Sequence, residues 1–173
     1  ARASILTGRI PSQHGVHDWL RRGNLAADKH AFAGDDAAIE YLRGQPGYTE
    51  ILAAHGYRVG LSGKWHLGDS ATPQKGHIYW HIIPYGGSNY FNAPWLENGQ
   101  VVHDPGYLTD AITQHAIEFL EEQQSRPEPF YLGVHYTAPH SPWDENQHPP
   151  ELRNLYADCP FESTYDDELH AAC

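Results

Sequence analysis

A few stretches of the chain show clear patterns of apolar and polar positions, and they predict the main elements of the fold. The strongest is a helical pattern from Thr109 to about Gln123, with Thr109 as its N-cap. An apolar run from Phe130 to Tyr136 has the length of a strand. The residues that recur at the spacing of one buried helical face are Ile112, Ala116, Phe119 and Leu120.

Shorter signals predict two helices near the start of the chain. Residues 1–9 have the small, Ser/Thr-rich character of a helix's opening turns, ended by Gly8. Residues 10–47 look loop-dominated, and a short helix is expected around residues 36–43.

A further helix and strand are predicted before the middle of the chain. Thr49 is a suitable N-cap for a helix that runs to His55 and stops at Gly56. A short strand over residues 58–63 follows, with Val59 and Leu61 on one face.

The order of helix, strand, long insert, helix and strand is typical of an α/β fold with a mostly parallel central sheet flanked by helices. Because residues 130–136 are apolar almost throughout, we expect a central strand that is covered on both faces. The insert, residues 64–106, is rich in Gly, Pro, Asn and aromatic residues, so it is expected to be ordered and functional and to contain hairpin strands.

Composition excludes several classes of protein. The 173 residues suffice for about one domain, and 40% hydrophobic with 19% charged residues is ordinary for a globular chain. A net charge of −11 argues against a nucleic-acid partner, and no apolar run approaches the roughly 18 residues of a membrane span. Cys159 and Cys173 fit no metal-binding spacing, and either a disulfide or two free thiols is compatible with them.

Basic residues follow two of the predicted strands. The first strand runs into Lys64 and His66, and the second runs into a loop that ends in His140. Parallel strands joined by a helical crossover would bring both loops to the same edge of the sheet, where α/β folds bind ligands. Lysine and histidine there suit a tetrahedral oxyanion, with histidine as a proton donor near neutral pH. These residue types do not separate sulfate esters from phosphate esters.

Three motifs resemble those of the formylglycine-dependent sulfatases, within the alkaline phosphatase superfamily. Their first signature reads Cys-x-Pro-Ser/Ala-Arg-x-x-x-Leu-Thr-Gly-Arg, and this chain opens with ARASILTGR at residues 1–9. The other two are GYRVGLSGKWHLG at residues 56–68 and PFYLGVHYTAPH at residues 129–140. The resemblance covers residues 1–142 and is weak after Phe161, so we expect residues 1–173 to be part of a sulfatase catalytic domain.

The resemblance implies roles for four residues in catalysis. Arg2 would orient the nucleophile, and Lys64 would bridge the nucleophile and the substrate sulfate. His66 would accept a proton from the formylglycine hydrate, and His140 would face the leaving-group oxygen as a general acid or sulfate ligand. Residues expected to shape the substrate pocket are His14, His17, Asp18 and Trp19.

The resemblance also implies groups that this chain does not carry. The cysteine that becomes formylglycine would stand three residues before Ala1. The family's calcium ligands are likewise expected outside these residues. The acidic pair Asp35-Asp36 follows the signature instead of preceding it, so we interpret it as a solvated loop. The expected substrate is a small-molecule or glycan sulfate ester, and the family is periplasmic, secreted or lysosomal. Two alternatives stay open: a phosphate or phosphonate monoester hydrolase of the same superfamily, and a truncated chain without catalysis.

Overall fold

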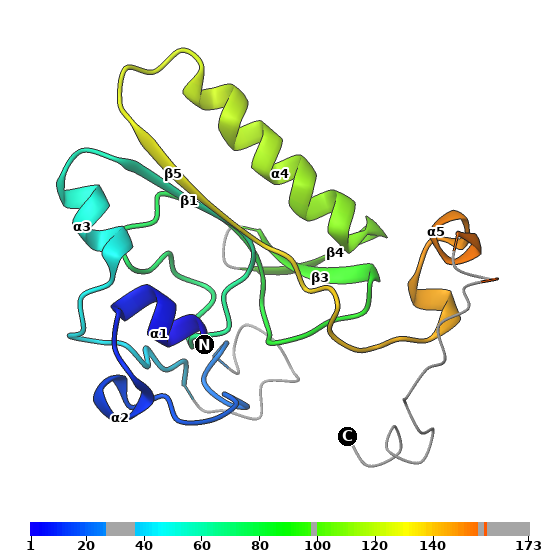
Figure 1. Cartoon of the computed structure of the whole chain (residues 1–173), viewed down its shortest axis with the longest axis horizontal. Helices are drawn as coiled ribbons and strands as arrows, with labels where there is room; N and C mark the ends of the chain where they lie inside the picture. The colour runs from blue at the N-terminus through cyan, green and yellow to red at the C-terminus, as the bar shows by residue number, and fades with distance from the viewer. Residues whose placement is uncertain (27–36, 98–99, 156–157, 159–173) are drawn as a thin grey trace. The chain divides into compact units, whose positions relative to one another are not determined.

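The fold was analysed in a computed structural model that describes residues 1–26, 37–97, 100–155 and 158 (Figure 1). The chain forms two compact units, Ala1–Pro142 and Trp143–Cys173. In the second unit the described elements are the 3₁₀ turn η1 (Glu145–Gln147) and helix α5 (Pro150–Asn154). The first unit holds the sheet and every predicted site residue.

A three-stranded parallel sheet forms the centre of the first unit. Strand β1 (Arg58–Lys64) lies between β2 (Tyr79–Ile83) and β5 (Phe130–His135). Lys64 of β1 pairs with Ile83 of β2, and Gly63 pairs with His135 of β5. The predicted α/β class and the parallel arrangement are confirmed, so all three strands end at one edge of the sheet.

The prediction that residues 130–136 form a central strand is wrong. In the described residues β5 lies at the end of the order β2-β1-β5, and Phe130 and Val134 are exposed. The central strand is β1, in which every residue after Arg58 is buried. Gly60 leaves room for the Phe119 ring of α4, a close approach that an apolar run alone does not reveal.

Helices cover the two faces of β1 (Figure 1). Helix α4 (Leu108–Gln123) packs on one face, where Ser62 Oγ donates to the carbonyl of Ile112 at 2.8 Å. Helices α1 (Arg2–Thr7) and α3 (Tyr48–Ala54) lie on the other face, and Leu61 belongs to the same core as Leu6 of α1. Of the predicted face of α4, Leu120 is instead 41% exposed.

Two predicted helix caps are displaced by two residues. Helix α3 is capped by Gly47, whose N–H donates to the Glu50 carboxylate at 2.8 Å, and α4 is capped by Tyr107. Thr49 is buried in the first turn instead of capping it. A side-chain carboxylate three residues into a helix can satisfy the cap position without a hydroxyl there.

The loop between α1 and α3 departs from the sequence prediction. Residues 37–43 contain no helix, because Glu40 forms a β-bridge with Gly68 and residues 41–44 form a turn. The short helix α2 (Pro11–His14) was not predicted. Asp35, Asp36, Cys159 and Cys173 lie outside the described residues.

The long insert contains the expected hairpin. Strands β3 (Phe91–Glu97) and β4 (Gln100–Tyr107) pair antiparallel next to β2. Tyr90 and Trp95 are buried in a core shared with Ile112 of α4. No helix in the described part of the chain is long and apolar enough to cross a membrane.

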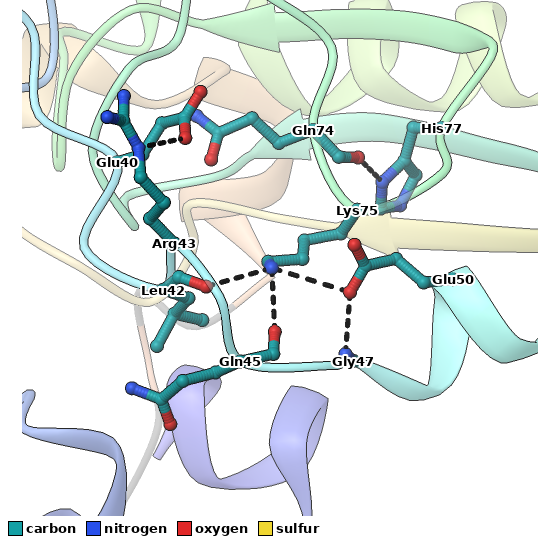
Figure 2. Close-up of polar contacts among 9 residues, drawn as sticks. All are labelled: Glu40, Leu42, Arg43, Gln45, Gly47, Glu50, Gln74, Lys75 and His77. Carbon is teal, nitrogen blue, oxygen red and sulfur yellow. Dashed lines mark hydrogen bonds and ion pairs between the residues drawn. The ribbon is translucent and has the colours of Figure 1, made fainter.

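A buried lysine ties the loop before α3 to the segment that joins β1 and β2 (Figure 2). Lys75 Nζ donates to the carbonyls of Leu42 at 2.9 Å and Gln45 at 2.7 Å, and it lies 3.4 Å from Glu50. Its side chain is 9% exposed. The Leu42 carbonyl also accepts from the Gln45 N–H at 3.1 Å, so the ammonium group adds a second, charged donor there and is the donor for the Gln45 carbonyl.

Candidate active site

All but one of the predicted site residues line a pocket of about 390 Å³ at the edge of the sheet where β1 and β5 end. Four of its lining residues are the predicted catalytic set, Arg2, Lys64, His66 and His140. They come from α1, from the end of β1 and from the loop after β5. Parallel pairing of β1 and β5 is what brings segments more than 60 residues apart to one place.

Arg2 is held in position by two acceptors. Its Nη1 donates to the Lys64 carbonyl at 3.0 Å and lies 3.1 Å from Nδ1 of His135. Nδ1 of His135 also lies 3.1 Å from the Lys64 carbonyl, so this nitrogen accepts from Arg2 in one tautomer and donates to the carbonyl in the other. Burial and the positive charge of Arg2 lower the pKa of His135, which keeps this imidazole neutral.

Lys64 is buried, and its charge has no partner among the residues that the structure describes. The residue is 8% exposed, and among the described residues none accepts a hydrogen bond from Nζ. Burial, and then the charge of Arg2, lower the pKa of this ammonium group. Two adjacent cations that lack a carboxylate partner create a local demand for an anion.

His66 is placed as a neutral proton acceptor. Its backbone is in the left-handed region with φ 54°, and its Nε2 lies 3.0 Å from the Leu20 carbonyl, so Nε2 carries the proton. Burial is the largest cause that lowers the pKa of His66, and the charges of Lys64, Arg2 and His140 lower it further, against the Leu20 hydrogen bond. Nδ1 is therefore available to accept a proton.

His140 lies at the open side of the pocket. Its Nδ1 donates to the Ser141 carbonyl at 2.8 Å, and its own carbonyl accepts from the Tyr90 hydroxyl at 2.7 Å. Since Nδ1 is occupied, Nε2 is the position from which a protonated ring can transfer a proton. The exposed ring can reach an oxygen atom of a bound ligand.

Three of the four predicted substrate-binding residues line the same pocket. His17, Asp18 and Trp19 are exposed on its rim, and Trp19 is 67% exposed. His14 does not line it. Its ring is buried between the Val16 N–H and Ser4 Oγ, at 3.1 Å and 3.0 Å, so it joins α1 to α2 instead.

Sequence reasoning missed His135 and the pair Gly86-Gly87. His135 ends β5 one strand away from Lys64, and that register was a usable signal once both strands were placed. The glycines follow β2 and lie against the rings of His66 and His140. Their role had no local signal, because it depends on side chains from two other loops.

The calcium ligands that the resemblance implies are not found in the described part of the chain. No group of three or more His, Cys, Asp or Glu side chains there is arranged to hold a metal ion. The pocket itself is lined by cations and histidines, with Asp18 as its acidic member. The residues that line this pocket do not fit a calcium ion.

The buried histidines predict a loss of stability in mild acid. Burial lowers the pKa of His66, His77, His81 and His135 below the ordinary value, so the unfolded chain binds more protons near pH 6. Stability therefore rises with pH in this range and is lost as the pH falls below about 6.5. We expect a lower thermal midpoint at pH 5.5 than at pH 7.5, measured by circular dichroism. A His77→Gln variant should show a weaker pH dependence, and equal midpoints for the parent at both pH values would contradict the prediction.

Comparison with known proteins identifies the family. The family model described as Sulfatase matches residues 1–172. The chain is 32% identical over 145 residues to an N-acetylglucosamine-6-O-sulfatase of Bacteroides thetaiotaomicron, which covers 83% of this chain and 22% of that protein. It is 28% identical to the human N-acetylglucosamine-6-sulfatase, over 91% of this chain and 29% of that protein. The chain thus spans about a quarter of the length of these relatives.

Solved structures agree with this result. The structure of BT4656 in complex with its substrate D-glucosamine-2-N,6-O-disulfate has a TM-score of 0.67 with this chain at 27% identity. The match covers 93% of this chain and 28% of that chain. Ps i-CgsB, solved with k-i-k-neocarrahexaose, has a TM-score of 0.71 at 24% identity over 93% of this chain and 38% of its own, and supports the fold. By its sequence motifs, its parallel sheet and these matches, the chain belongs to the sulfatase family.

Proposed function

We propose that this chain forms part of the active site of a longer sulfatase that hydrolyses the sulfate ester of a carbohydrate. The observation that carries the proposal is the gathering of Arg2, Lys64, His66 and His140 in one pocket, beside the exposed Trp19. The pocket thus combines cationic groups, two imidazoles and an aromatic surface. In a sulfated sugar these would bind the sulfate anion, the ester oxygen and the apolar face of the sugar ring, respectively.

The sulfate group would bind between the two cations. Lys64 Nζ has a charge without an acceptor in the described residues, and Arg2 is fixed by the Lys64 carbonyl and His135. An anion bound there relieves the mutual repulsion of the two cations. Preorganised donors of this kind stabilise the charge that develops on the sulfuryl oxygens in the transition state.

The two histidines suit opposite proton transfers. In this family the hydrate of formylglycine would supply the hydroxyl that attacks sulfur. His66 would accept a proton from that hydrate at Nδ1, because its Nε2 is bonded to the Leu20 carbonyl. His140, when protonated, would donate from Nε2 to the ester oxygen of the departing alcohol. A neutral His66 and an exposed His140 fit these roles.

The carbohydrate part of the substrate would lie over the rim formed by residues 17–19. Trp19 offers an exposed ring for stacking on a sugar, and Asp18 offers a carboxylate as an acceptor for sugar hydroxyls. The relatives named as N-acetylglucosamine 6-sulfatases support a 6-sulfated amino sugar as the first substrate to test.

The test is a comparison of rates for the longer protein and for the 173-residue chain. We expect the longer protein to hydrolyse 4-nitrophenyl sulfate and N-acetylglucosamine 6-sulfate faster than 4-nitrophenyl phosphate, with formylglycine detected by mass spectrometry of its signature peptide. The 173-residue chain should show no turnover, since its sequence lacks the signature cysteine. Faster phosphate hydrolysis would favour the phosphatase alternative, and turnover of neither ester would favour a non-catalytic protein.

A further inference from the structure

The loop after β2 lies against both active-site histidines. Strand β2 ends at the same sheet edge as β1 and β5, and Gly86-Gly87 follow three residues later. A Cβ atom built on Gly86 would lie 2.3 Å from Cε1 and from Nε2 of His66. A Cβ atom on Gly87 would lie 3.2 Å from Cε1 of His140. Bare backbone at both positions is therefore in contact with an imidazole ring.

Space, and not backbone conformation, explains the glycine at position 86. Neither Gly86 nor Gly87 has a positive φ, unlike Gly63 near the end of β1 and Gly68 in the loop that follows it. An L-residue can therefore adopt the backbone conformation, but its side chain has no room. Real Cβ atoms do not approach other heavy atoms within 3.0 Å, so any side chain at position 86 must displace the His66 ring.

The segment after this loop also holds the backbone of His140 through a hydrogen bond. Tyr90, at the start of the hairpin, is fully buried, and its hydroxyl donates to the His140 carbonyl at 2.7 Å. The His66 ring is bounded on one side by Gly86 and is held by its hydrogen bond to Leu20. One short segment, residues 86–90, thus positions two side chains that reach the pocket from different strands.

We propose that the Gly86-Gly87 backbone is the wall that sets the positions of the His66 and His140 rings, and that Gly86 is a positioning residue of this site. Its effect on catalysis rests on the proposed function, whereas its effect on the His66 ring does not. Displacement of a reacting group by about 1 Å costs on the order of 100-fold in rate. A Gly86→Ala methyl group requires a displacement of that size.

A double-mutant cycle in the longer sulfatase tests the catalytic effect. Gly86→Ala should lower kcat/KM for 4-nitrophenyl sulfate by at least about tenfold, mainly through kcat, and it should shift the acidic limb of the pH profile. In a His66→Ala background, where the ring is gone, Gly86→Ala should change kcat/KM by less than about twofold. Additive losses in the two backgrounds would overturn the proposal.

Two further variants separate positioning from folding. Gly106→Ala, on the exposed side of β4 where the nearest atom is the carboxylate end of Asp104, should leave kcat/KM unchanged. If Gly86→Ala does not fold, the double variant with His66→Ala should fold, because the ring no longer obstructs the methyl group. Failure of that double variant to fold would show a general structural role for Gly86 and would overturn the proposal.

The ring itself gives a readout without catalysis. In the 173-residue chain labelled with ¹⁵N-histidine, we expect His66 to show the Nε2-protonated tautomer, in keeping with its bond to Leu20. Gly86→Ala should shift these resonances, whereas Gly106→Ala should not. Unmoved His66 resonances in Gly86→Ala would overturn the proposal even if the parent is an active sulfatase. Shifted resonances in a protein without sulfatase activity would support the positioning role and refute the proposed function.

Discussion

Replacing Lys64 with methionine is expected to lower kcat of the longer enzyme on an aryl sulfate by about 100- to 1,000-fold, the usual cost of removing one preorganised transition-state donor. The side chain is largely buried and lines the pocket, its pKa is lowered by burial and by the charge of Arg2, and Nζ has no acceptor among the described residues. Its charge is therefore available to a bound sulfate. Methionine keeps the length and apolar character of the side chain and removes only the charge.

Stability provides the control for this variant. Because Lys64 has no ion-pair or hydrogen-bond partner in the described part of the chain and burial lowers its pKa, Lys64→Met should leave the thermal midpoint unchanged or raise it. Steady-state kinetics and thermal unfolding should be measured on the same preparation. A kcat within threefold of the parent would remove Lys64 from the proposed site, and a large loss of stability would assign it a structural role instead.

Replacing Lys75 with methionine is expected to have the opposite pair of effects. The variant should lose about 2–4 kcal/mol of unfolding free energy, because the carbonyls of Leu42 and Gln45 lose a charged donor in a buried place (Figure 2). The Glu50 contact adds little, since that carboxylate is 41% exposed and lies 3.4 Å away. The kcat of the protein that remains folded should be close to that of the parent.

Denaturant unfolding and active-site-normalised kinetics measure the two effects. Glu50→Gln is the matched control, because it keeps an acceptor for the Gly47 N–H and for Lys75 and should cost less than 1 kcal/mol or so. An unchanged unfolding free energy for Lys75→Met would show that the two carbonyls find water instead. A selective loss of kcat would mean that the loop before α3 contributes to the chemistry.

The pattern of the chain predicted which segments are regular but not where they lie in the sheet. Helix α4 and strands β1 and β5 follow from periodicity, since burial of one helical face or of a whole strand leaves a direct mark on residue type. The strand order does not, and the apolar run of β5 led to a wrong central position. Helix caps were missed for a similar reason, because a Glu50 side chain replaced the expected threonine.

Most of the residues that the motifs predict for the site come together in one pocket, because the backbone carries them to the same edge of the sheet. Lys64 and His66 end or follow β1, and His140 follows β5, so parallel pairing places them together. His14 has the same residue type and lies in the same opening region, yet its ring is used between α1 and α2. Residue type near a motif does not tell which way a side chain points.

Motif spacing and apolar periodicity, which are local properties of the chain, were enough to predict the family and the α/β class and to propose the cationic residues of the site. The contacts of each buried group became visible only in the folded chain. Three oxygens lie near Nζ of Lys75, whereas none of the described residues accepts a hydrogen bond from Nζ of Lys64, although both lysine side chains are largely removed from solvent. Likewise, position 86 has no room for a side chain because the His66 ring, 20 residues away in the chain, packs against its backbone.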